Sequence, residues 1–368
     1  MKTFNRFAVL AILVLTTALC SVSCTDDDKD GEGPVLPQAT PRAIVLNEGG
    51  MGSGLAGLSV LYTDGNIVYD PFRKANNRPL GDVAQFMDCF NGKYFVTLNS
   101  SNKVEVIDTA SFESVATIVF DEDCSPRYMA AVSDSTAVVS DANRLLLINT
   151  KTNKFIEYIE TENKYEQMLT VGNKLFCANK SAKNIAVYNT NDLHNPRFID
   201  MNNFACKTSP LIEDRNGNIW VYCAIEFNPS APKFFVKFNP ETEQVLETIS
   251  LPDSIKTRDY LRMDRDSKGD KIYFDGYVAG SWGAPDVKYA YTIDVDTHEF
   301  AKYVALRGTD MIYGMNVDAD GGVWVCDCLD YSRQRGYLRY YPANNSDVLT
   351  SWRVGIYPNY VYFPDKNK

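Results

Sequence analysis

Histidine is almost absent from this chain, which carries only His194 and His298 among its 368 residues. Both are predicted to lie in polar turns between strands. Ser-His-Asp and Cys-His catalysis need an imidazole beside the nucleophile, so neither device is expected. The sequence also lacks a Walker loop and a metal-spaced cluster of His, Cys and Asp, so we expect no metal site and no enzyme. Paired carboxylates of a glycoside hydrolase stay open, because acidic residues are plentiful.

Basic charge is also scarce, since 37 Lys and Arg stand against 47 Asp and Glu, a formal charge of −10. Removal of residues 1–23 would delete Lys2 and Arg6 and no acidic residue, which makes the charge −12. Nucleic-acid binding needs a basic surface that displaces counterions from phosphates. We therefore expect no nucleic-acid partner.

Long apolar runs are lacking too. Phe7 to Leu19 is too short to cross a bilayer, and it follows two basic residues and precedes CSVSC, as in a signal peptide. Ser23 before Cys24 suits lipoprotein processing. We predict that residues 1–23 are a lipoprotein signal peptide and that Cys24 is lipidated. Plain secretion with an unmodified Cys24 is the alternative.

The next segment, residues 24–40, is acidic at first, then rich in Gly and Pro, and has no apolar periodicity. Such a segment cannot bury enough surface to fold, so it is predicted to be a flexible tether. Its acidic start resembles the export signal of surface lipoproteins in Bacteroidetes. That resemblance implies an outer-membrane protein held by its lipid anchor alone and facing the cell exterior. A spacer without such an address is the alternative.

Cysteine numbers nine, and no C-x-x-C spacing suggests zinc. Without Cys20 and a lipidated Cys24 seven remain, so at least one thiol is unpaired, and the sequence leaves the pairing open. Four cysteines in apolar runs are predicted to be buried core residues: Cys177, Cys223, Cys326 and Cys328.

A glycine-rich stretch, Gly52-Ser-Gly-Leu-Ala-Gly57, spells G-x-G-x-x-G directly after an apolar run. A dinucleotide-binding turn of that spelling must lead into a helix inside a βαβ unit. The residues after Gly57 alternate as a strand and then turn. The stretch is therefore predicted to be a loop between two strands, and no dinucleotide cofactor is expected.

Helical periodicity is lacking from about residue 41 onward. Short β-rich runs instead alternate with Gly, Asn, Asp and Pro, and six segments align as strand, polar turn, strand. An Asx residue commonly opens the turn, where its side chain bonds the backbone ahead. These residues recur at steps of 41, 40, 50 and 55: Asp108, Asn149, Asn189, Asn239 and Asp294. A period near 40–50 built from four strands is typical of a β-propeller blade.

Two further strands precede each hairpin, which predicts six complete four-stranded blades. Residues 42–77 supply three more strands, and the C-terminal Tyr357 to Phe363 resembles the first strand of a blade. Pairing that strand with the N-terminal three would close the ring and remove free sheet edges. The predicted fold is all-β, a seven-bladed β-propeller over residues 41–368 whose ring is closed by the C-terminal strand in the N-terminal blade.

Loops of variable length on a fixed scaffold are the usual place for binding. In a propeller, the loops from second to third strands share one face with the starts of the inner strands. Here Asn47–Gly57, Ile225–Lys233, Gly276–Lys288 and Leu329–Gly336 would wall a central funnel on that face. An aromatic and polar lining suits a large amphipathic ligand, and a water-filled channel is the alternative. The candidate ligand-binding residues are Asn47, Glu48, Met51, Asp82, Gln85, Asn99, Arg127, Tyr128, Tyr165, Phe227, Tyr260, Arg262, Tyr277, Trp282, Tyr313, Tyr331, Tyr357 and Asn359.

The tryptophans divide into two kinds. Trp220 and Trp324 occupy matching positions in second strands and are predicted to be core. Trp282 lies among Gly, Ala and Ser in a long loop. Its indole either anchors a ligand or partner or folds back over its own blade. Tyr277 and Phe227 have the same two interpretations.

Four stretches, VLNEGGMGSGLAGLSVLY, RPLGDVAQFM, NSSNKVEVID and SPRYMA, resemble the YncE-like seven-bladed propeller lipoproteins of Bacteroidetes. Among these the sequence is most similar to the BtuG-type vitamin B12-capture proteins. The resemblance spans essentially the whole mature chain and is strongest over Val45 to Tyr128.

The resemblance implies a non-enzymatic surface protein that binds cobalamin or other corrinoids over the funnel. It also implies that the ligand passes to a BtuB-like TonB-dependent transporter of the outer membrane. No histidine is predicted near the funnel, so we expect no protein imidazole on the cobalt. Two other functions stay open, a surface glycan-binding propeller and a protein-interaction scaffold without a small-molecule ligand.

Overall fold

The computed structural model describes residues 39–121, 123–179, 182–201, 210–224, 232–258, 261–280, 285–343, 345 and 350–366. The chain divides into two compact units, residues 1–33 and 34–368, and every described residue belongs to the second. The predicted signal peptide, the lipidated Cys24 and most of the tether lie outside the described residues. Within the described ranges, no helix has the length and apolar character needed to cross a membrane.

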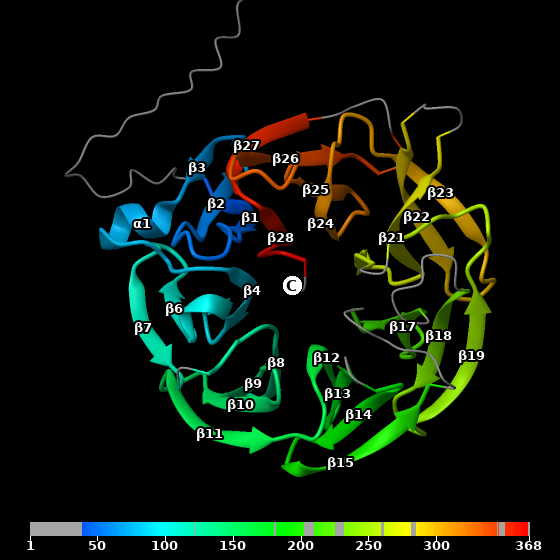
Figure 1. Cartoon of the computed structure of the whole chain (residues 1–368), viewed down its shortest axis with the longest axis horizontal. Helices are drawn as coiled ribbons and strands as arrows, with labels where there is room; N and C mark the ends of the chain where they lie inside the picture. The colour runs from blue at the N-terminus through cyan, green and yellow to red at the C-terminus, as the bar shows by residue number, and fades with distance from the viewer. Residues whose placement is uncertain are drawn as a thin grey trace, which may run out of the picture. The chain divides into compact units, whose positions relative to one another are not determined.

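Seven four-stranded antiparallel sheets are arranged in a ring, which confirms the predicted β-propeller (Figure 1). Blade 1 consists, from the centre outward, of β28 (Pro358–Tyr362), β1 (Pro41–Asn47), β2 (Gly57–Tyr62) and β3 (Ile67–Tyr69). Blade 2 consists of β4 (Ala84–Phe90), β5 (Lys93–Leu98), β6 (Lys103–Asp108) and β7 (Ser114–Val119), with the short 3-10 helix η1 (Asn99–Ser101) after β5. Blade 3 consists of β8 (Met129–Ser133), β9 (Thr136–Ser140), β10 (Arg144–Asn149) and β11 (Lys154–Glu160).

The other four blades repeat this order. Blade 4 consists of β12 (Tyr165–Val171), β13 (Lys174–Asn179), β14 (Asn184–Asn189) and β15 (Asp192–Asp200). Blade 5 consists of β16 (Ile212–Glu213), β17 (Ile219–Ala224), β18 (Lys233–Asn239) and β19 (Gln244–Ser250). Blade 6 consists of β20 (Met263–Asp264), β21 (Lys271–Val278), β22 (Val287–Asp294) and β23 (Phe300–Ala305). Blade 7 consists of β24 (Ile312–Val317), β25 (Val323–Asp327), β26 (Arg335–Tyr341) and β27 (Thr350–Ile356).

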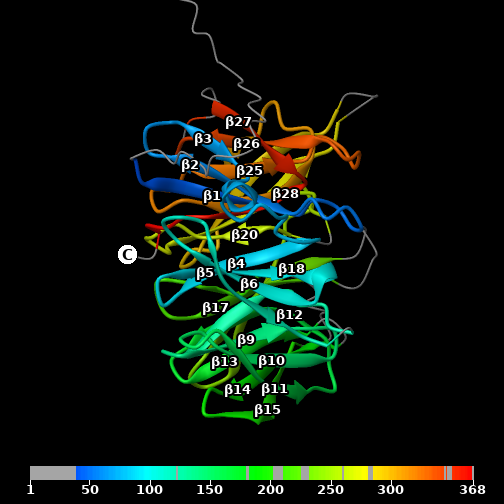
Figure 2. The same ribbon diagram turned by 90° about the vertical axis from the view of Figure 1, so that its left-hand side faces the viewer.

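The ring closes as predicted, because β28 pairs antiparallel with β1 and places Tyr362 opposite Ile44. The residues after β28 continue past the closure. Lys366 Nζ donates to Asp264 Oδ1 in blade 6 at 2.6 Å, and the Phe363 ring packs on Trp324 of blade 7. In Figure 1 the C-terminal end lies at the centre of the ring, and in Figure 2 it lies on the opposite face from the loop after β1. The C-terminal segment thus connects three blades.

The predicted Asx turns are present between the third and fourth strands of successive blades. Each Oδ1 accepts hydrogen bonds of 2.8–3.0 Å from backbone N–H groups two or three residues ahead, at Asp108, Asn149, Asn189, Asn239 and Asp294. These bonds fix the turn without help from distant residues. Because neighbouring residues alone set each turn, the repeat can be recognised in the sequence.

A second repeat of turns, which the sequence analysis did not identify, joins the first and second strands of blades 5, 6 and 7. A buried or half-buried Asp caps each turn and also accepts a hydrogen bond from an aromatic side chain of the next strand. The pairs are Asp214 with the Trp220 indole at 2.7 Å, Asp266 with the Tyr273 hydroxyl at 3.0 Å, and Asp318 with the Trp324 indole at 2.9 Å.

Apolar side chains fill the spaces between neighbouring blades. Trp220 and Phe235 of blade 5, for example, pack against Phe274 and Tyr291 of blade 6. Trp220 and Trp324 are fully buried, which confirms their predicted core positions. The cysteines predicted to be core are also confirmed as buried: Cys177, Cys223, Cys326 and Cys328.

Two local features of blade 1 bear on the predictions. The G-x-G-x-x-G stretch leads directly into β2 at Gly57, which confirms a loop between strands. The short helix α1 (Pro71–Asn76) was not predicted. Asp70 caps it by accepting from the Arg73 N–H at 3.2 Å, and Pro71 at the first position is preorganised for a helix.

One buried carboxylate, Glu105 on β6, is held by a group of donors. Arg78 Nη2 donates to its Oε1 at 2.6 Å, and Lys103 Nζ lies 3.0 Å from its Oε2. Burial raises the pKa of this carboxyl group, but hydrogen bonds from Arg78, Ser114 and Lys103 outweigh it and lower the pKa below its ordinary value. The charged form of Glu105 therefore stabilises the folded state.

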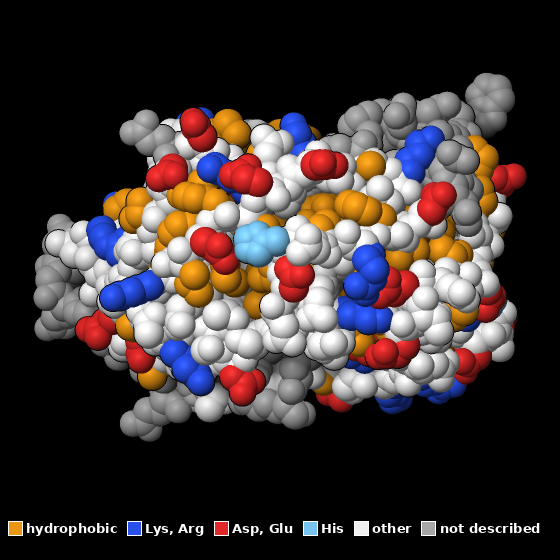
Figure 3. Space-filling view, turned by 90° about the horizontal axis from the view of Figure 1, so that it is seen from below, with side chains coloured by type: hydrophobic (Ala, Val, Ile, Leu, Met, Phe, Trp, Pro, Cys, Tyr) orange, Lys and Arg blue, Asp and Glu red, His pale blue; other side chains and the backbone are white. Residues whose placement is uncertain are grey.

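Figure 3 views the ring edge-on and shows patches of hydrophobic side chains among charges of both signs. The outer strands carry exposed apolar side chains, since Val119, Ile156, Phe198 and Leu246 are each between 45% and 66% exposed. The outer edge is therefore mixed in character, and nothing in the described structure shows what covers its apolar part.

Candidate binding site on the funnel face

The centre of the candidate site is a hydrogen bond between blades 1 and 7. Tyr313 Oη on β24 donates to Glu48 Oε2, just after β1, at 2.6 Å. The Glu48 N–H donates to the Tyr357 carbonyl at 2.9 Å, which fixes the backbone there. Burial raises the pKa of Glu48, the Tyr313 bond and the Arg127 charge lower it, and Asp82 raises it, for a net increase. Glu48 is thus a half-buried acceptor at the funnel.

Three tyrosine rings gather around this bond. The Tyr313 ring lies 5.9 Å from the Tyr357 ring and 6.4 Å from the Tyr331 ring, centroid to centroid. The Tyr357 hydroxyl donates to the Tyr331 carbonyl, which ties the loop after β25 to the start of β28. Tyr331 is 68% exposed, so it presents its ring to solvent. Together the rings offer an aromatic surface beside polar groups.

The glycine-rich loop after β1 is folded around the Asp82 carboxylate. Gly52 N–H donates to Asp82 Oδ2 at 2.6 Å, and Gly54 N–H donates to Oδ1 at 3.4 Å. Gly49 has φ +85°, and a Cβ there would lie 2.3 Å from the Ala56 nitrogen, so only glycine fits. Asp82 therefore positions this loop, and its carboxylate is occupied by backbone donors.

A second contact joins this loop to the loop after β25. Arg333 Nη2 donates to the Met51 carbonyl at 3.0 Å. The Met51 side chain is 73% exposed and remains available at the rim. The two loops predicted to wall the funnel therefore form one connected surface. Arg333 was missed because a lone Arg in a polar loop carries no pattern.

Polar residues of blades 2 and 3 lie on the same face. Arg127 Nε lies 2.9 Å from Glu166 Oε2, and the Arg127 charge also acts on Glu48. Gln85 Nε2 donates to Tyr128 Oη at 3.4 Å. Burial raises the pKa of Tyr128 to about 12, so its hydroxyl stays protonated and can donate.

Two further predicted residues, Arg262 and Asn359, donate to backbone carbonyls. Arg262 Nε and Nη2 donate to the Tyr313 carbonyl at 3.2 and 3.1 Å. Asn359 Nδ2 donates to the Ala84 carbonyl at 2.9 Å, whereas its buried Oδ1 accepts no hydrogen bond from the part of the chain that the structure describes. Arg262 and the Asn359 amide nitrogen are thus held by backbone carbonyls, and the Asn359 oxygen is a buried acceptor.

Asn47 and Tyr165 lie in the core instead of the lining. Asn47 is 1% exposed and holds the β1–β2 pair together through hydrogen bonds to Gly57 and Ser59. Tyr165 is 2% exposed, and its hydroxyl accepts from Tyr188 Oη at 3.2 Å. Both residues lie on strands, Asn47 at the end of β1 and Tyr165 at the start of β12, where successive side chains point to opposite faces of the sheet.

The other predicted residues have mixed positions. Asn99 is half-buried, and its N–H donates to the Val83 carbonyl at 2.8 Å. Tyr277 lies at the end of β21, in the wall of a cavity between blades 6 and 7. Phe227, Tyr260 and Trp282 lie outside the described residues.

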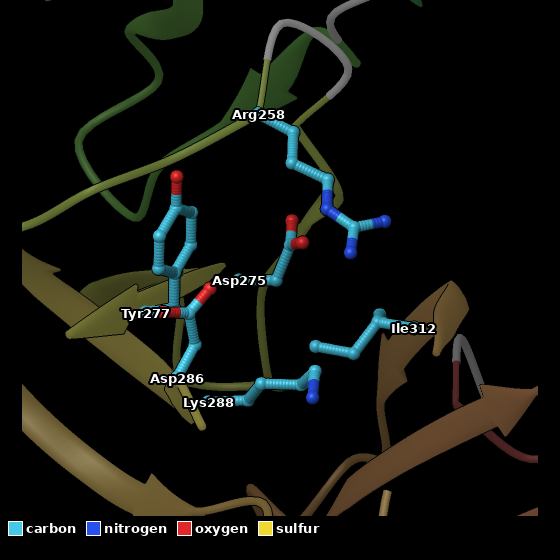
Figure 4. Close-up of a pocket in the computed structure, with 7 residues that line it drawn as sticks. Arg258, Asp275, Tyr277, Asp286, Lys288 and Ile312 are labelled. Atoms are coloured by element: carbon cyan, nitrogen blue, oxygen red, sulfur yellow. The ribbon is translucent and has the colours of Figure 1, made fainter. Parts of the chain in front are cut away.

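That cavity has a volume of about 210 Å³. Its lining combines charged, aromatic and apolar residues from both blades: Arg258, Asp275, Gly276, Tyr277, Asp286, Lys288 and Ile312 (Figure 4). Burial raises the pKa of Asp275, while Arg262 and Arg258 lower it, with a net increase. Apart from Tyr277 and the loop range that contains it, these lining residues were not predicted, because they lie within otherwise ordinary strands and loops.

The histidines lie elsewhere. His298 occupies the turn between β22 and β23 as predicted, with its Nδ1 3.2 Å from Glu247 Oε2. His194 lies within β15, so the turn prediction is wrong for it, since that strand begins at Asp192. Among the described residues, no group of three or more His, Cys, Asp or Glu is placed to hold a metal ion.

Solved structures with the same fold have low sequence identity. A functionally unknown protein from Desulfotomaculum acetoxidans is 15% identical, with a TM-score of 0.58 over 89% of this chain and 100% of that chain. The selenomethionine-substituted virginiamycin B lyase from Staphylococcus aureus is 11% identical, with a TM-score of 0.55 over 73% of this chain and 84% of that one. Dihydro-heme d1 dehydrogenase NirN in complex with DHE is 12% identical, with a TM-score of 0.54 over 89% and 78%. Because enzymes are among them, the fold by itself does not decide between binding and catalysis.

No curated protein matches the sequence. The resemblance to YncE-like propellers and BtuG-type cobalamin capture therefore stays a prediction. A family model does match, over residues 43–327, which run from β1 in blade 1 to the end of β25 in blade 7. This range is well over half of the chain, which therefore belongs to the family described as Domain of unknown function (DUF5074).

Proposed function

We propose that this protein binds cobalamin or related corrinoids at the funnel face and does no chemistry on them. In this proposal a lipid on Cys24 anchors it to the outer membrane, facing the cell exterior. The bound corrinoid then passes to a BtuB-like TonB-dependent transporter. The acidic, then Gly- and Pro-containing composition of residues 24–40 supports this arrangement, because a tether of that composition would let the funnel reach a neighbouring protein.

The observation that carries the proposal is the Glu48–Tyr313 bond with the Tyr331 and Tyr357 rings beside it. A corrinoid is a broad macrocycle with amide side chains around its rim. Phenol rings supply contact area at low entropic cost, and a half-buried carboxylate accepts from amide N–H groups. Arg127 adds a donor for amide carbonyls. The site therefore offers area and orientation for a large amphipathic ligand.

Two features support binding without catalysis. The carboxylate of Asp82, which acts on Glu48 electrostatically, already accepts from Gly52 and Gly54. The Asp82 carboxylate therefore holds the loop in place, which makes it a poor general acid or base. Each histidine has its own partner away from Glu48: His298 pairs with Glu247, and His194 with Glu157.

The test is calorimetric titration of residues 34–368 with cyanocobalamin, followed by corrinoid absorbance after gel filtration. We expect co-elution and tight binding. Tyr331→Ala should weaken binding about tenfold or more, because it removes an aromatic anchor at the site centre. Leu246→Ala is the matched control, since Leu246 is 48% exposed on the outer strand β19 and should have no effect.

Absence of binding at high micromolar cobalamin would refute the proposal. Binding of oligosaccharides instead, weakened by the same Tyr331→Ala change, would favour a glycan-binding propeller. For the anchor, Cys24→Ala should release the protein from the outer membrane in fractionated cells. Continued membrane association of that variant would contradict lipidation at Cys24.

A further inference from the structure

We propose that the cavity between blades 6 and 7 is an oxyanion subsite of the funnel, which receives the phosphodiester of a corrinoid's nucleotide loop. The inference rests on the proposed function, but the anion chemistry of the cavity can be tested without a corrinoid. It is carried by hydrogen-bond donors that have no partner among the described residues and by carboxylates that already have one.

The donors are Arg258, Lys288 and Tyr277. Within the part of the chain that the structure describes, the Arg258 guanidinium and the Lys288 ammonium group form no ion pair and donate no hydrogen bond. The Tyr277 hydroxyl likewise has no hydrogen-bond partner there. In Figure 4 the Arg258 side chain reaches toward Asp275, and the Lys288 chain runs toward Ile312. Donors that lack a partner among the described residues and surround one cavity favour a ligand with several hydrogen-bond acceptors.

The carboxylates of the cavity are already engaged. Asp275 Oδ1 accepts from the Arg262 N–H at 2.7 Å, and Asp275 Oδ2 lies 3.8 Å from Arg262 Nη1. Asp286 Oδ1 accepts from the Gly280 N–H at 3.0 Å. Among the described residues, Arg258 and Lys288 in the wall and Arg262 beside it therefore give three cations against these two carboxylates. The described charges leave one positive charge in excess, which a phosphodiester would neutralise.

The volume and the location of the cavity also fit a phosphodiester. A volume of about 210 Å³ corresponds to roughly seven waters at about 30 Å³ each, which is room for a tetrahedral oxyanion and its attached carbons. Ile312 supplies an apolar wall for those carbons. Arg262 donates both to Asp275, which lines the cavity, and to the Tyr313 carbonyl, so it links the cavity wall to the aromatic surface. A ligand over Tyr313 can therefore extend a substituent into the cavity.

The experiment compares cyanocobalamin with dicyanocobinamide, which lacks the nucleotide loop and its phosphate. Lys288→Gln and Arg258→Gln should each weaken cobalamin binding about tenfold or more, the loss expected for a hydrogen bond to a charged group. Both variants should leave cobinamide affinity within about twofold of wild type. Lys154→Gln, an exposed change on the outer strand β11, is the control and should alter neither affinity.

Equal losses for both corrinoids, or no loss for cobalamin, would overturn the subsite. If the wild type binds neither corrinoid, the proposed function fails, and inorganic phosphate becomes the probe. A phosphate-dependent rise in melting temperature that the wild type shows and Lys288→Gln lacks would support an anion site without corrinoid binding. The same rise in both proteins, or in neither, would overturn it.

Discussion

Removal of the Asp214 carboxylate should destabilise the propeller through one buried indole. Trp220 is fully buried, and its Nε1–H donates to Asp214 Oδ2 at 2.7 Å. The other oxygen accepts from the N–H groups of Asn216 and Asn218 at 2.8 and 2.9 Å. The change Asp214→Ala removes both acceptor oxygens and with them all three hydrogen bonds. Water can reach the two turn residues, but not the buried indole.

The expected loss in free energy of unfolding follows from which of the three donors water can reach. An unsatisfied buried donor costs about 1–3 kcal/mol, and each turn bond that water can replace contributes about 0.5 kcal/mol. We therefore expect Asp214→Ala to lower the free energy of unfolding by about 2–4 kcal/mol. In a Trp220→Phe background the indole donor is absent, so the same change should cost only about 1 kcal/mol. The difference is a coupling energy of about 1–3 kcal/mol.

The assay is urea unfolding at pH 7 of wild type, both single variants and the double variant, followed by circular dichroism and fluorescence. Coincident transitions by both probes establish a common reference. Asp318→Ala with Trp324→Phe repeats the cycle in blade 7, where the matching bond is 2.9 Å. Additive losses within about 0.5 kcal/mol would refute the reasoning, because the two residues would then act independently.

Three other predictions concern the ring and the loop. Lys366→Ala should lower the free energy of unfolding by about 1–2 kcal/mol in urea titrations, because it removes the ammonium group bound to Asp264, and an unchanged value would contradict a stabilising C-terminal segment. Because the folded pKa of Glu105 is lowered, its contribution to stability is present above the ordinary carboxyl pKa of about 4.3 and is lost as pH falls through the folded pKa. The stability advantage of wild type over Glu105→Gln should therefore shrink below about pH 4.3, and a constant difference would argue against it. Gly49→Ala should lower the melting temperature far more than Gly52→Ala. A Cβ at Gly49 would meet backbone atoms at 2.3 Å, whereas one at Gly52 would meet nothing within 4 Å. Equal shifts in melting temperature would show that the loop relaxes around the added methyl group.

Much of the fold was predictable because residues close together in the sequence determine its turns and strands. An Asx residue such as Asp108 or Asp294 bonds backbone groups two or three residues ahead, so each turn is encoded where it forms. Alternating apolar residues then mark the strands on either side. Repetition of that unit predicted the blades, and the unpaired C-terminal strand predicted the closure. The short first strands β16 and β20 were less well delimited, with two residues each.

Part of the site was also predictable. Blade geometry predicted Glu48, Arg127, Tyr313 and Tyr357 on one face, because the starts of the inner strands and the loops between second and third strands share it. Of these, Glu48 and Tyr357 each contact Tyr313. It did not foresee that Tyr165 is buried, since its contact is a hydroxyl bond to Tyr188 within the blade. The helix α1 was missed because six residues hold too little periodicity to detect.

The sequence by itself determined the all-β architecture, the number of blades and the face that carries the variable loops, since each follows from short-range pattern. The tertiary structure alone decided which side chains meet. Glu48 and Tyr313 are separated by 265 residues and become bonded only when blade 7 closes against blade 1. The cavity between blades 6 and 7 also depends on the tertiary structure, because its wall combines residues before β20, the β21–β22 region and Ile312 at the start of β24.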